Sequence, residues 1–400
     1  MRRLALIVVT AVVGLPGALS AQESVFNLPP FGVPENGATI RMRALGGAGS
    51  GAGGEVFSLA NPAPLGRFRR AGLYLSMLGQ DVTVDGAEAS GEFTDVLFPM
   101  GQIVIPAWRG TVLALGYYQF VDFDTHLEAT VEFEGDTLPV ELESTGGVSV
   151  LAPAVAWSID AATQVGASLD IYLGSREIVR VVDLADLSPG SLASSDSLAR
   201  DFRGTGFTVG VERTLGPRLR VSAAYRFRPE LESDVTRAPG DDLVTTTSRF
   251  DLPDEISAGV TWQASRGVVA TAAFRRSAWS SFEPAGLENV GFGDALELGA
   301  GIEFSPAARR ALLFGPQAPI RVGYRWRRLP LEIDGEAVTE WTGSLGYGRT
   351  LGSAGRSGLD IVLEYGRRGS LEDHGLEESF LRLGLGFRAL EQWRRDRPDS

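Results

Sequence analysis

Hydrophobic and polar residues alternate with a period of two in many separate segments of the chain. Segment 321–327 places Val322, Tyr324 and Trp326 on one face and arginines or a glycine on the other, and 381–388 repeats the pattern. Successive side chains of a β-strand point to opposite faces. Each such segment is therefore predicted to be a strand with one apolar and one polar face.

About fourteen segments carry this pattern. An even number of antiparallel strands of roughly ten residues is typical of single-chain bacterial membrane barrels. The predicted strands are 71–84, 94–106, 110–122, 146–158, 163–176, 200–213, 217–228, 252–264, 267–277, 294–304, 318–328, 337–350, 356–366 and 379–388.

The connections between these strands alternate in length. Short ones such as 106–110 are followed by long ones such as 229–251. Because barrels of this kind have short periplasmic turns and long external loops, both termini are expected on the periplasmic side. Segment 123–145 also alternates, and it is predicted to form a hairpin that projects above the membrane.

A soluble β-sandwich would show the same alternation and is the alternative. Here, however, the polar face carries Arg, Glu and Gly. Arg and Glu suit a confined polar lumen, and Gly leaves room where another segment packs inside it. Glycine makes up 50 of 400 residues, or 12.5%, against about 7% in ordinary proteins. No apolar run beyond residue 21 approaches the ~18 residues of a membrane helix. The fold class predicted is all-β, a transmembrane antiparallel β-barrel.

The first residues have the layout of a secretory signal. Arg2 and Arg3 precede a run of apolar residues, and small residues follow up to Ala21. A membrane anchor is the alternative, but the apolar run of about twelve residues is short of the ~20 needed to span. We expect 1–21 to be a signal peptide and the mature protein to reach the outer membrane of a Gram-negative-type bacterium.

The segment between the signal and the first strand does not alternate. It contains several prolines and a Gly/Ala tract, and about 45 irregular residues are more than a barrel needs to begin. We therefore predict a plug at 22–70 inside the lumen, a barrel at 71–388 and a periplasmic tail at 389–400. A periplasmic location for the first of these segments is the alternative.

Charge and composition exclude several functions. The formal net charge of −13 argues against a nucleic-acid binder. Two His and no Cys leave almost no material for a metal, haem or thiol site, so neither a metal nor a cofactor is expected. An enzyme ranks last, because Asp373-His374 with a loop serine is the only arrangement that could serve a hydrolase.

Several motifs occur in a familiar order. The run Arg43–Gly49 is followed by Asn61-Pro62-Ala63, later by Leu252–Val260, and then by Pro319–Arg325 and Glu364–Gly369. Together they resemble the FadL/TodX family of outer-membrane transporters of long-chain fatty acids and other hydrophobic compounds. The resemblance covers most of the chain after the signal.

The resemblance implies a 14-stranded barrel with an N-terminal hatch. In that family ligand enters from outside, binds apolar pockets over the hatch and leaves sideways through a gap beside a kinked early strand. The hatch motif carries over to Asn61, Pro62 and Ala63, where Pro fixes φ and Asn can bond its own backbone. Candidates for the wall kink are Pro99, Gly101 and Gly116.

Ligand-binding residues can be proposed from the same picture. Large apolar groups of the plug would stabilise a lipid tail by about 0.8 kcal/mol per buried CH₂. Lumen arginines could pair with a carboxylate head, although the alternative is that they neutralise lumen Glu and Asp. The candidates are Phe26, Leu28, Phe31, Phe57, Leu59 and Phe68 for the apolar pocket, and Arg220, Arg226, Arg321 and Arg325 for the carboxylate.

The predicted function is therefore passive outer-membrane transport of long-chain fatty acids or other hydrophobic small molecules. A non-transport barrel acting as a scaffold or secretion-system partner is the alternative. The expected partners are the ligand, outer-membrane lipid and the barrel-assembly machinery, with a monomeric barrel and no nucleic acid.

Overall fold

A computed structural model describes most of the chain, in twelve segments. These are residues 24–27, 32–49, 55–86, 90–108, 110–133, 136–182, 194–237, 244–282, 291–305, 318–333, 335–351 and 357–391. The predicted signal 1–21, the candidates Leu28 and Phe31, and the tail from 392 onward lie outside the described residues.

The described part of the chain is dominated by strands. The strands are β1 (Ala71–Gly86), β2 (Ser90–Leu97), β3 (Met100–Pro106), β4 (Thr111–Asp122), β5 (Thr125–Phe133), β6 (Asp136–Ser158), β7 (Thr163–Val182), β8 (Ser194–Leu215), β9 (Leu219–Arg237), β10 (Val244–Asp251), β11 (Glu255–Ser265), β12 (Val268–Ser277), β13 (Gly291–Phe292), β14 (Ala295–Phe304), β15 (Ile320–Ile333), β16 (Glu336–Leu351), β17 (Ser357–Ser370) and β18 (Leu376–Glu391). Short helical turns are η1 (Val25–Asn27), α2 (Ile40–Arg43), η2 (Ala63–Arg67), η3 (Trp279–Ser281) and α3 (Leu371–His374).

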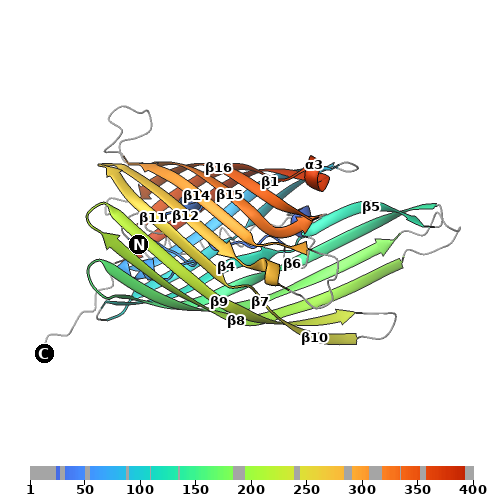
Figure 1. Cartoon of the computed structure of the whole chain (residues 1–400), viewed down its shortest axis with the longest axis horizontal. Coiled ribbons are helices and arrows are strands. Elements are labelled where there is room, and N and C mark those ends of the chain that lie inside the picture. Colours follow the sequence, from blue (N-terminus) through green and yellow to red (C-terminus); the bar gives the residue numbers. More distant parts are fainter. Residues whose placement is uncertain are drawn as a thin grey trace, which may run out of the picture.

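The strands form one closed antiparallel sheet (Figure 1). β1 pairs with β18 from Ala71–Glu391 to Gly86–Leu376, which closes the barrel. Four strands of the wall are each divided into two consecutive segments, and both segments pair with the same neighbouring strand. These are β2 and β3 beside β1, β4 and β5 beside β6, β10 and β11 beside β9, and β13 and β14 beside β15. The 18 described strands thus make 18 − 4 = 14 barrel strands, and the predicted count is confirmed.

The two faces of the wall differ as the alternation predicts. Tyr324 is 52% exposed and Leu383 53% exposed on the outside, whereas the next residue in β15, Arg325, is buried. An apolar outer belt on a closed sheet is the arrangement of a membrane-spanning barrel, and it contradicts the sandwich alternative. No helix in the described segments reaches the length and hydropathy needed to cross a membrane.

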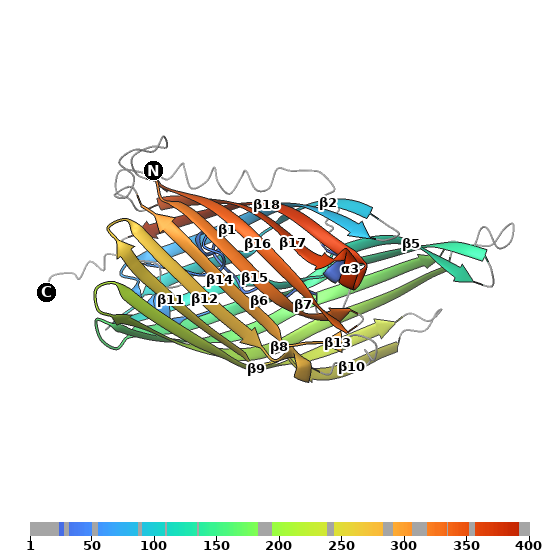
Figure 2. The same cartoon turned by 45° about the horizontal axis from the view of Figure 1, so that its top comes forward.

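The barrel is longer on one side. β6, β7, β8 and β9 reach beyond the neighbouring strands, and the β5–β6 hairpin projects furthest (Figure 2). This hairpin, registered from Thr125–Ser144 to Phe133–Asp136, confirms the projection predicted for 123–145. At the opposite rim the last strand extends to Glu391, three residues beyond the predicted boundary at 388 (391 − 388), because it continues to pair with β1.

The described N-terminal residues lie inside this cylinder. We call 24–27, 32–49 and 55–70 the inner segment. Most of its apolar side chains are buried, and it packs against inward-facing positions of strands on several sides of the wall.

Candidate functional site

Glycines on the inner wall make room for the inner segment. After α2 the chain turns through Gly46 and Gly47, whose φ angles of 68° and 78° suit glycine. A Cβ on Gly323 of β15 would collide with the main-chain N of Gly46, and one on Gly301 of β14 would lie 2.6 Å from Leu45 Cα. The small residues on the polar face therefore mark where the inner segment is seated.

The Asn61-Pro62-Ala63 motif forms a rigid turn against the opposite wall. Asn61 Oδ1 accepts a 2.9 Å hydrogen bond from the N–H of Ala63, and Asn61 Nδ2 donates at 3.2 Å to the carbonyl of Ala223 in β9. A Cβ on Gly166 of β7 would lie 2.6 Å from the carbonyl carbon of Pro62. The motif thus anchors the start of η2 to the wall.

The four described candidates for the apolar pocket pack against the wall or against one another. Phe57 lies 4.9 Å from Phe68 and 5.4 Å from Tyr74, measured between ring centroids. Leu59 fills the space above Gly116 of β4, and Phe26 belongs to a separate apolar cluster. None of the four described candidates borders the cavities given below, because their faces are covered by the wall.

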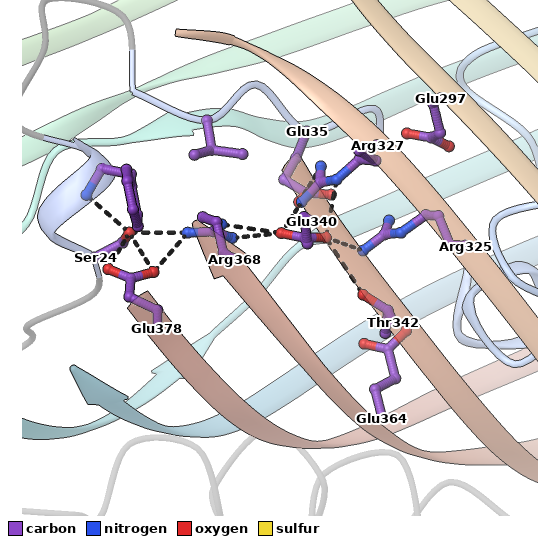
Figure 3. A network of polar contacts seen from close by, with 12 residues as sticks. Ser24, Glu35, Glu297, Arg325, Arg327, Glu340, Thr342, Glu364, Arg368 and Glu378 are labelled. Carbon is purple, nitrogen blue, oxygen red and sulfur yellow. Dashed lines mark hydrogen bonds and ion pairs between the residues drawn. The ribbon is translucent and has the colours of Figure 1, made fainter. Parts of the chain in front are cut away.

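A buried group of charges joins the inner segment to four consecutive strands (Figure 3). At its centre Glu340 of β16 accepts hydrogen bonds from Arg327 at 2.7 Å and from Arg368 at 2.8 Å, and Arg325 approaches it at 3.4 Å. We call this group the central charge network. Its members are Arg43, Arg325, Arg327, Arg368, Glu35, Glu340, Glu364 and Glu378.

The inner segment enters this network at three points. Each point pairs a residue of the inner segment with a charged residue of the wall, so the segment is tied to β15, β17 and β18. The contacts are Ser24 Oγ to Glu378 Oε1 (2.8 Å), Arg327 Nη1 to Glu35 Oε1 (3.1 Å) and Arg43 Nη2 to Glu364 Oε2 (2.8 Å).

Glu35 is the member with the most access to solvent, since its side chain is 31% exposed. Burial by itself would raise the pKa of Glu35, but Arg327, Arg325 and Arg43 hold it well below its usual range. The carboxylate therefore stays ionised in the folded protein.

The four arginines predicted to bind a carboxylate all have partners. Arg321 bonds Glu303 and Asp360, each at 2.7 Å. Arg226 lies 3.4 Å from Asp170, Arg325 belongs to the central charge network, and Arg220 is likewise partnered. These contacts correspond to the alternative interpretation, in which lumen arginines neutralise lumen carboxylates.

The wall is interrupted between β2 and β3, at Phe98 and Pro99. β1 pairs with β3 up to Leu75–Gly101 and with β2 from Leu78–Leu97 onward, so the ladder is missing between these pairs. Proline has no N–H to donate to a ladder, which accounts for the break at this position.

Of the three kink candidates, only Pro99 lies at the interruption. Gly101 and Gly116 occupy regular paired positions, opposite Tyr117 and Gln102 respectively. For Gly116 the space is used by Leu59 rather than by a bend in the strand.

An open cavity lies beside this interruption. Including its solvent-filled mouth it encloses about 720 Å³. We call it the lateral cavity. Its lining includes Leu97 and Pro99 at the break, Leu78 of β1, Val33 of the inner segment and Phe380 of β18.

Two further cavities, of about 450 and 310 Å³, lie toward the end with the long loops; we call them the mouth cavities. Both are bordered by Pro34 and Trp279, and the ring of Trp279 packs against Phe282 at 5.1 Å between centroids. Phe120 of β4 borders the lateral cavity and both mouth cavities.

Sequence reasoning missed Glu35, Phe120 and Arg382 as cavity residues. Arg382 stands on the predicted polar face of the last strand, which was the one signal available. Among the described residues, no group of three or more His, Asp or Glu is arranged to hold a metal ion.

Comparison with solved structures supports the barrel type. A FadL homologue of Pseudomonas aeruginosa aligns with a TM-score of 0.61 at 16% identity, over 91% of this chain and 99% of that one. The toluene transporter TbuX of Ralstonia pickettii aligns with 0.60 at 16% identity (92% and 100%), and the toluene transporter TodX of P. putida with 0.59 at 13% (90% and 100%). At these identities the likeness shows the fold, and the predicted FadL/TodX-type barrel is confirmed.

No match was found among curated proteins. A protein-family model described as BamG matches residues 1–397, nearly the whole sequence. The chain therefore belongs to the BamG family.

Proposed function

We propose that the protein is a passive transporter of hydrophobic small molecules, such as long-chain fatty acids, across the outer membrane. The observation that carries the proposal is the lateral cavity, which lies between the inner segment and the wall at the interruption beside Pro99. A route from the mouth cavities past Phe120 to this break would release an apolar molecule into the bilayer rather than into water. The names of the solved neighbours, among them toluene transporters, agree with such a cargo.

The inner segment serves as the hatch in this proposal. Its residues close the lumen through the central charge network on one side and the Asn61 turn on the other. Hydrophilic solutes are thereby excluded from the lumen. An apolar ligand does not need the whole lumen to open, because it uses only the passage beside Phe120.

The proposal is tested by uptake of a radiolabelled long-chain fatty acid in cells that express the protein. Wild type is compared with empty vector, with Asn61→Ala and with a deletion of the hatch residues 24–70. Wild type should exceed empty vector, Asn61→Ala should alter the flux, and the deletion should admit small hydrophilic dyes as well. Flux at the empty-vector level in all three proteins would defeat the proposal.

A second candidate is a structural role beside the barrel-assembly machinery, which the name of the matched family suggests. The firm attachment of the inner segment by buried ion pairs favours it, because a scaffold does not need a lumen that opens. Cross-linking in cells followed by purification separates the two. Stoichiometric recovery of the assembly machinery together with uptake at the empty-vector level would support the scaffold.

A further inference from the structure

The outer face of the wall changes from apolar to charged at the end with the long loops. Phe274 of β12 and Tyr365 of β17 are exposed on the outside, and two residues further toward the loops stand the exposed Arg276 and Arg367. Two residues of a strand span about 7 Å. Because outward aromatic residues mark the edge of the hydrocarbon in membrane barrels, these guanidinium groups lie just beyond it, at the level of the lipid headgroups.

Exposed arginines occupy this level, or lie beyond it, on several strands of one side of the barrel. We call them the arginine arc. All six stand in the part of their strand that is nearer the long loops, and each forms an ion pair. They are Arg203 of β8, Arg228 of β9, Arg249 of β10, Arg276 of β12, Arg328 of β15 and Arg367 of β17.

The ion pairs of the arc turn the arginines outward. In each of them the arginine side chain is more exposed than its acidic partner, for example 59% against 28% for Arg276 and Asp294, and 48% against 25% for Arg367 and Glu377. The carboxylates therefore orient the arginines while the guanidinium groups face the surroundings of the barrel. A guanidinium has five N–H donors, so a paired arginine can still donate to a second anion.

Strands near the wall interruption lack this arrangement. On the described parts of β1, β2, β4 and β18 the outward positions toward the long loops carry no arginine, and on β1 and β2 they carry Asp81, Asp85 and Glu92. The interruption itself lies beside Pro99. An anion at the membrane surface is therefore attracted to the arc and repelled near the interruption.

Phosphate is the anion that suits this position. Its oxygens accept paired hydrogen bonds from the planar guanidinium group, and phosphates are the anionic groups of lipids at the membrane surface. The aromatic and apolar side chains directly below the arc, such as Tyr365 and Leu363, face the hydrocarbon and would contact the acyl chains of the same molecule. The arc thus combines a phosphate-binding level with an acyl-binding level on one outer surface.

We propose that the arginine arc binds the phosphate groups of a phosphorylated glycolipid in the outer leaflet of the membrane. The lipid is held on the side of the barrel from β8 to β17 and is absent from the strands beside Pro99. This inference concerns the outer surface of the wall, so it goes beyond the proposed transport through the lumen and applies equally to a scaffold.

The test is a binding measurement on the purified full-length protein in a non-ionic detergent, with native mass spectrometry as the readout. The probes are phosphorylated lipid A and the same lipid after removal of its phosphates. Excess EDTA is present, so that divalent cations cannot bridge the lipid to acidic side chains. Wild type is compared with a variant that combines Arg228→Gln, Arg276→Gln and Arg367→Gln; Arg328 is left unchanged because it also borders a mouth cavity.

The matched control combines Arg213→Gln, Arg218→Gln and Arg266→Gln. These arginines are also exposed, but they lie at the rim with the short turns, and their replacement changes the net charge by the same amount. A general effect of charge would therefore appear in both variants, whereas an effect of the arc appears in only one.

Wild type should bind phosphorylated lipid A at least about tenfold more tightly than the dephosphorylated lipid, as expected for charge-assisted hydrogen bonds. The arc variant should lose this preference and the control variant should keep it. Equal binding of the two lipids by wild type would overturn the inference, and so would an equal loss of preference in the two variants. If the arc variant does not fold, the comparison of the two lipids in wild type and in the control variant still decides.

This test is independent of the transport experiment. A preference for the phosphorylated lipid that depends on the arc, found together with uptake at the empty-vector level, would keep the lipid site and refute transport. Uptake above the empty-vector level, with no such preference, would keep transport and refute the lipid site.

Discussion

The main-chain N–H of Glu35 donates a 2.7 Å hydrogen bond to the carbonyl oxygen of Phe120. This bond joins the inner segment to β4 at a residue that lines the lateral cavity and both mouth cavities. Glu35 lines the lateral cavity and one mouth cavity, and Phe120 lines all three. A molecule that moved from a mouth cavity to the lateral cavity along this border would pass Phe120.

Phe120→Ala should therefore join the cavities. We expect faster uptake of bulky hydrophobic compounds, because the aromatic ring no longer narrows the passage. The same change should lower the free energy of unfolding by about 3–5 kcal/mol, as for other buried phenylalanines. Uptake of labelled compounds of increasing width, measured beside thermal unfolding, checks both effects.

Phe123→Ala is the matched control for this experiment. Like Phe120, Phe123 is buried, but it is not among the described residues that line the three cavities. It should lose comparable stability without a gain in uptake. Equal uptake by the two variants would mean that Phe120 does not limit passage.

Gly323→Ala should dislodge the inner segment while leaving the barrel intact. The added Cβ would meet the backbone N of Gly46, which cannot move independently of the turn that carries it. Gly343→Ala, on the adjacent strand, is the control because its Cβ would meet only Tyr365 O at 4.0 Å. Limited proteolysis should cleave the inner segment of Gly323→Ala faster than that of wild type or Gly343→Ala. Identical cleavage rates would show that the glycine does not seat the turn.

The strand positions were predictable because lipid and lumen impose opposite polarity on alternate residues. Tyr324 and Arg325 are neighbours in sequence, yet one faces hydrocarbon and the other lies buried among charges. Beyond the membrane both faces can meet water and this constraint weakens. β9 accordingly continues to Arg237, nine residues beyond the predicted end at 228 (237 − 228).

The partners of the inward-facing arginines were less predictable, because pairing depends on neighbours that only the fold brings together. Arg325 and Arg382 stand at the same kind of inward position in strands with similar patterns. Glu340 reaches Arg325 from the adjacent strand, whereas Glu364, directly opposite Arg382 on β17, pairs with Arg43 of the inner segment instead. Alternation along a strand reports which way a side chain points but not what lies across from it.

Glu35 makes the stability of the protein depend on pH. Its pKa is depressed in the folded state, so its stabilisation is fully present above the unfolded-state value of about 4.3 and is lost as the pH falls toward the lower folded-state value. The difference in unfolding free energy between wild type and Glu35→Gln should be constant between about pH 8 and 6 and shrink from about pH 5 to 3. Denaturant unfolding across this range checks it. A difference that stays constant down to the lowest pH would contradict the assignment.

Arg368 and Arg382 allow the cost of an unpaired buried charge to be compared directly. Both are buried, and both lie near the Phe380 ring, at 5.8 and 4.0 Å from its centroid. Arg368→Met would leave Glu340 and Glu378 short of a partner and should cost about 3–5 kcal/mol, the usual loss when one member of a buried pair is removed.

Arg382→Met should behave differently, because no carboxylate of the described residues lies within ion-pair distance of it, and Glu364, opposite it on β17, is paired with Arg43. Removing the buried charge also removes the cost of its desolvation, and this gain offsets the lost contact with the Phe380 ring and the lost hydrogen bond to Gln80. The unfolding free energy should therefore fall by less than about 1 kcal/mol, or rise. Denaturant unfolding of both variants in the same detergent decides between these expectations. A loss for Arg382→Met as large as that for Arg368→Met would mean that the carboxylates near Arg382, among them Glu364, already neutralise it.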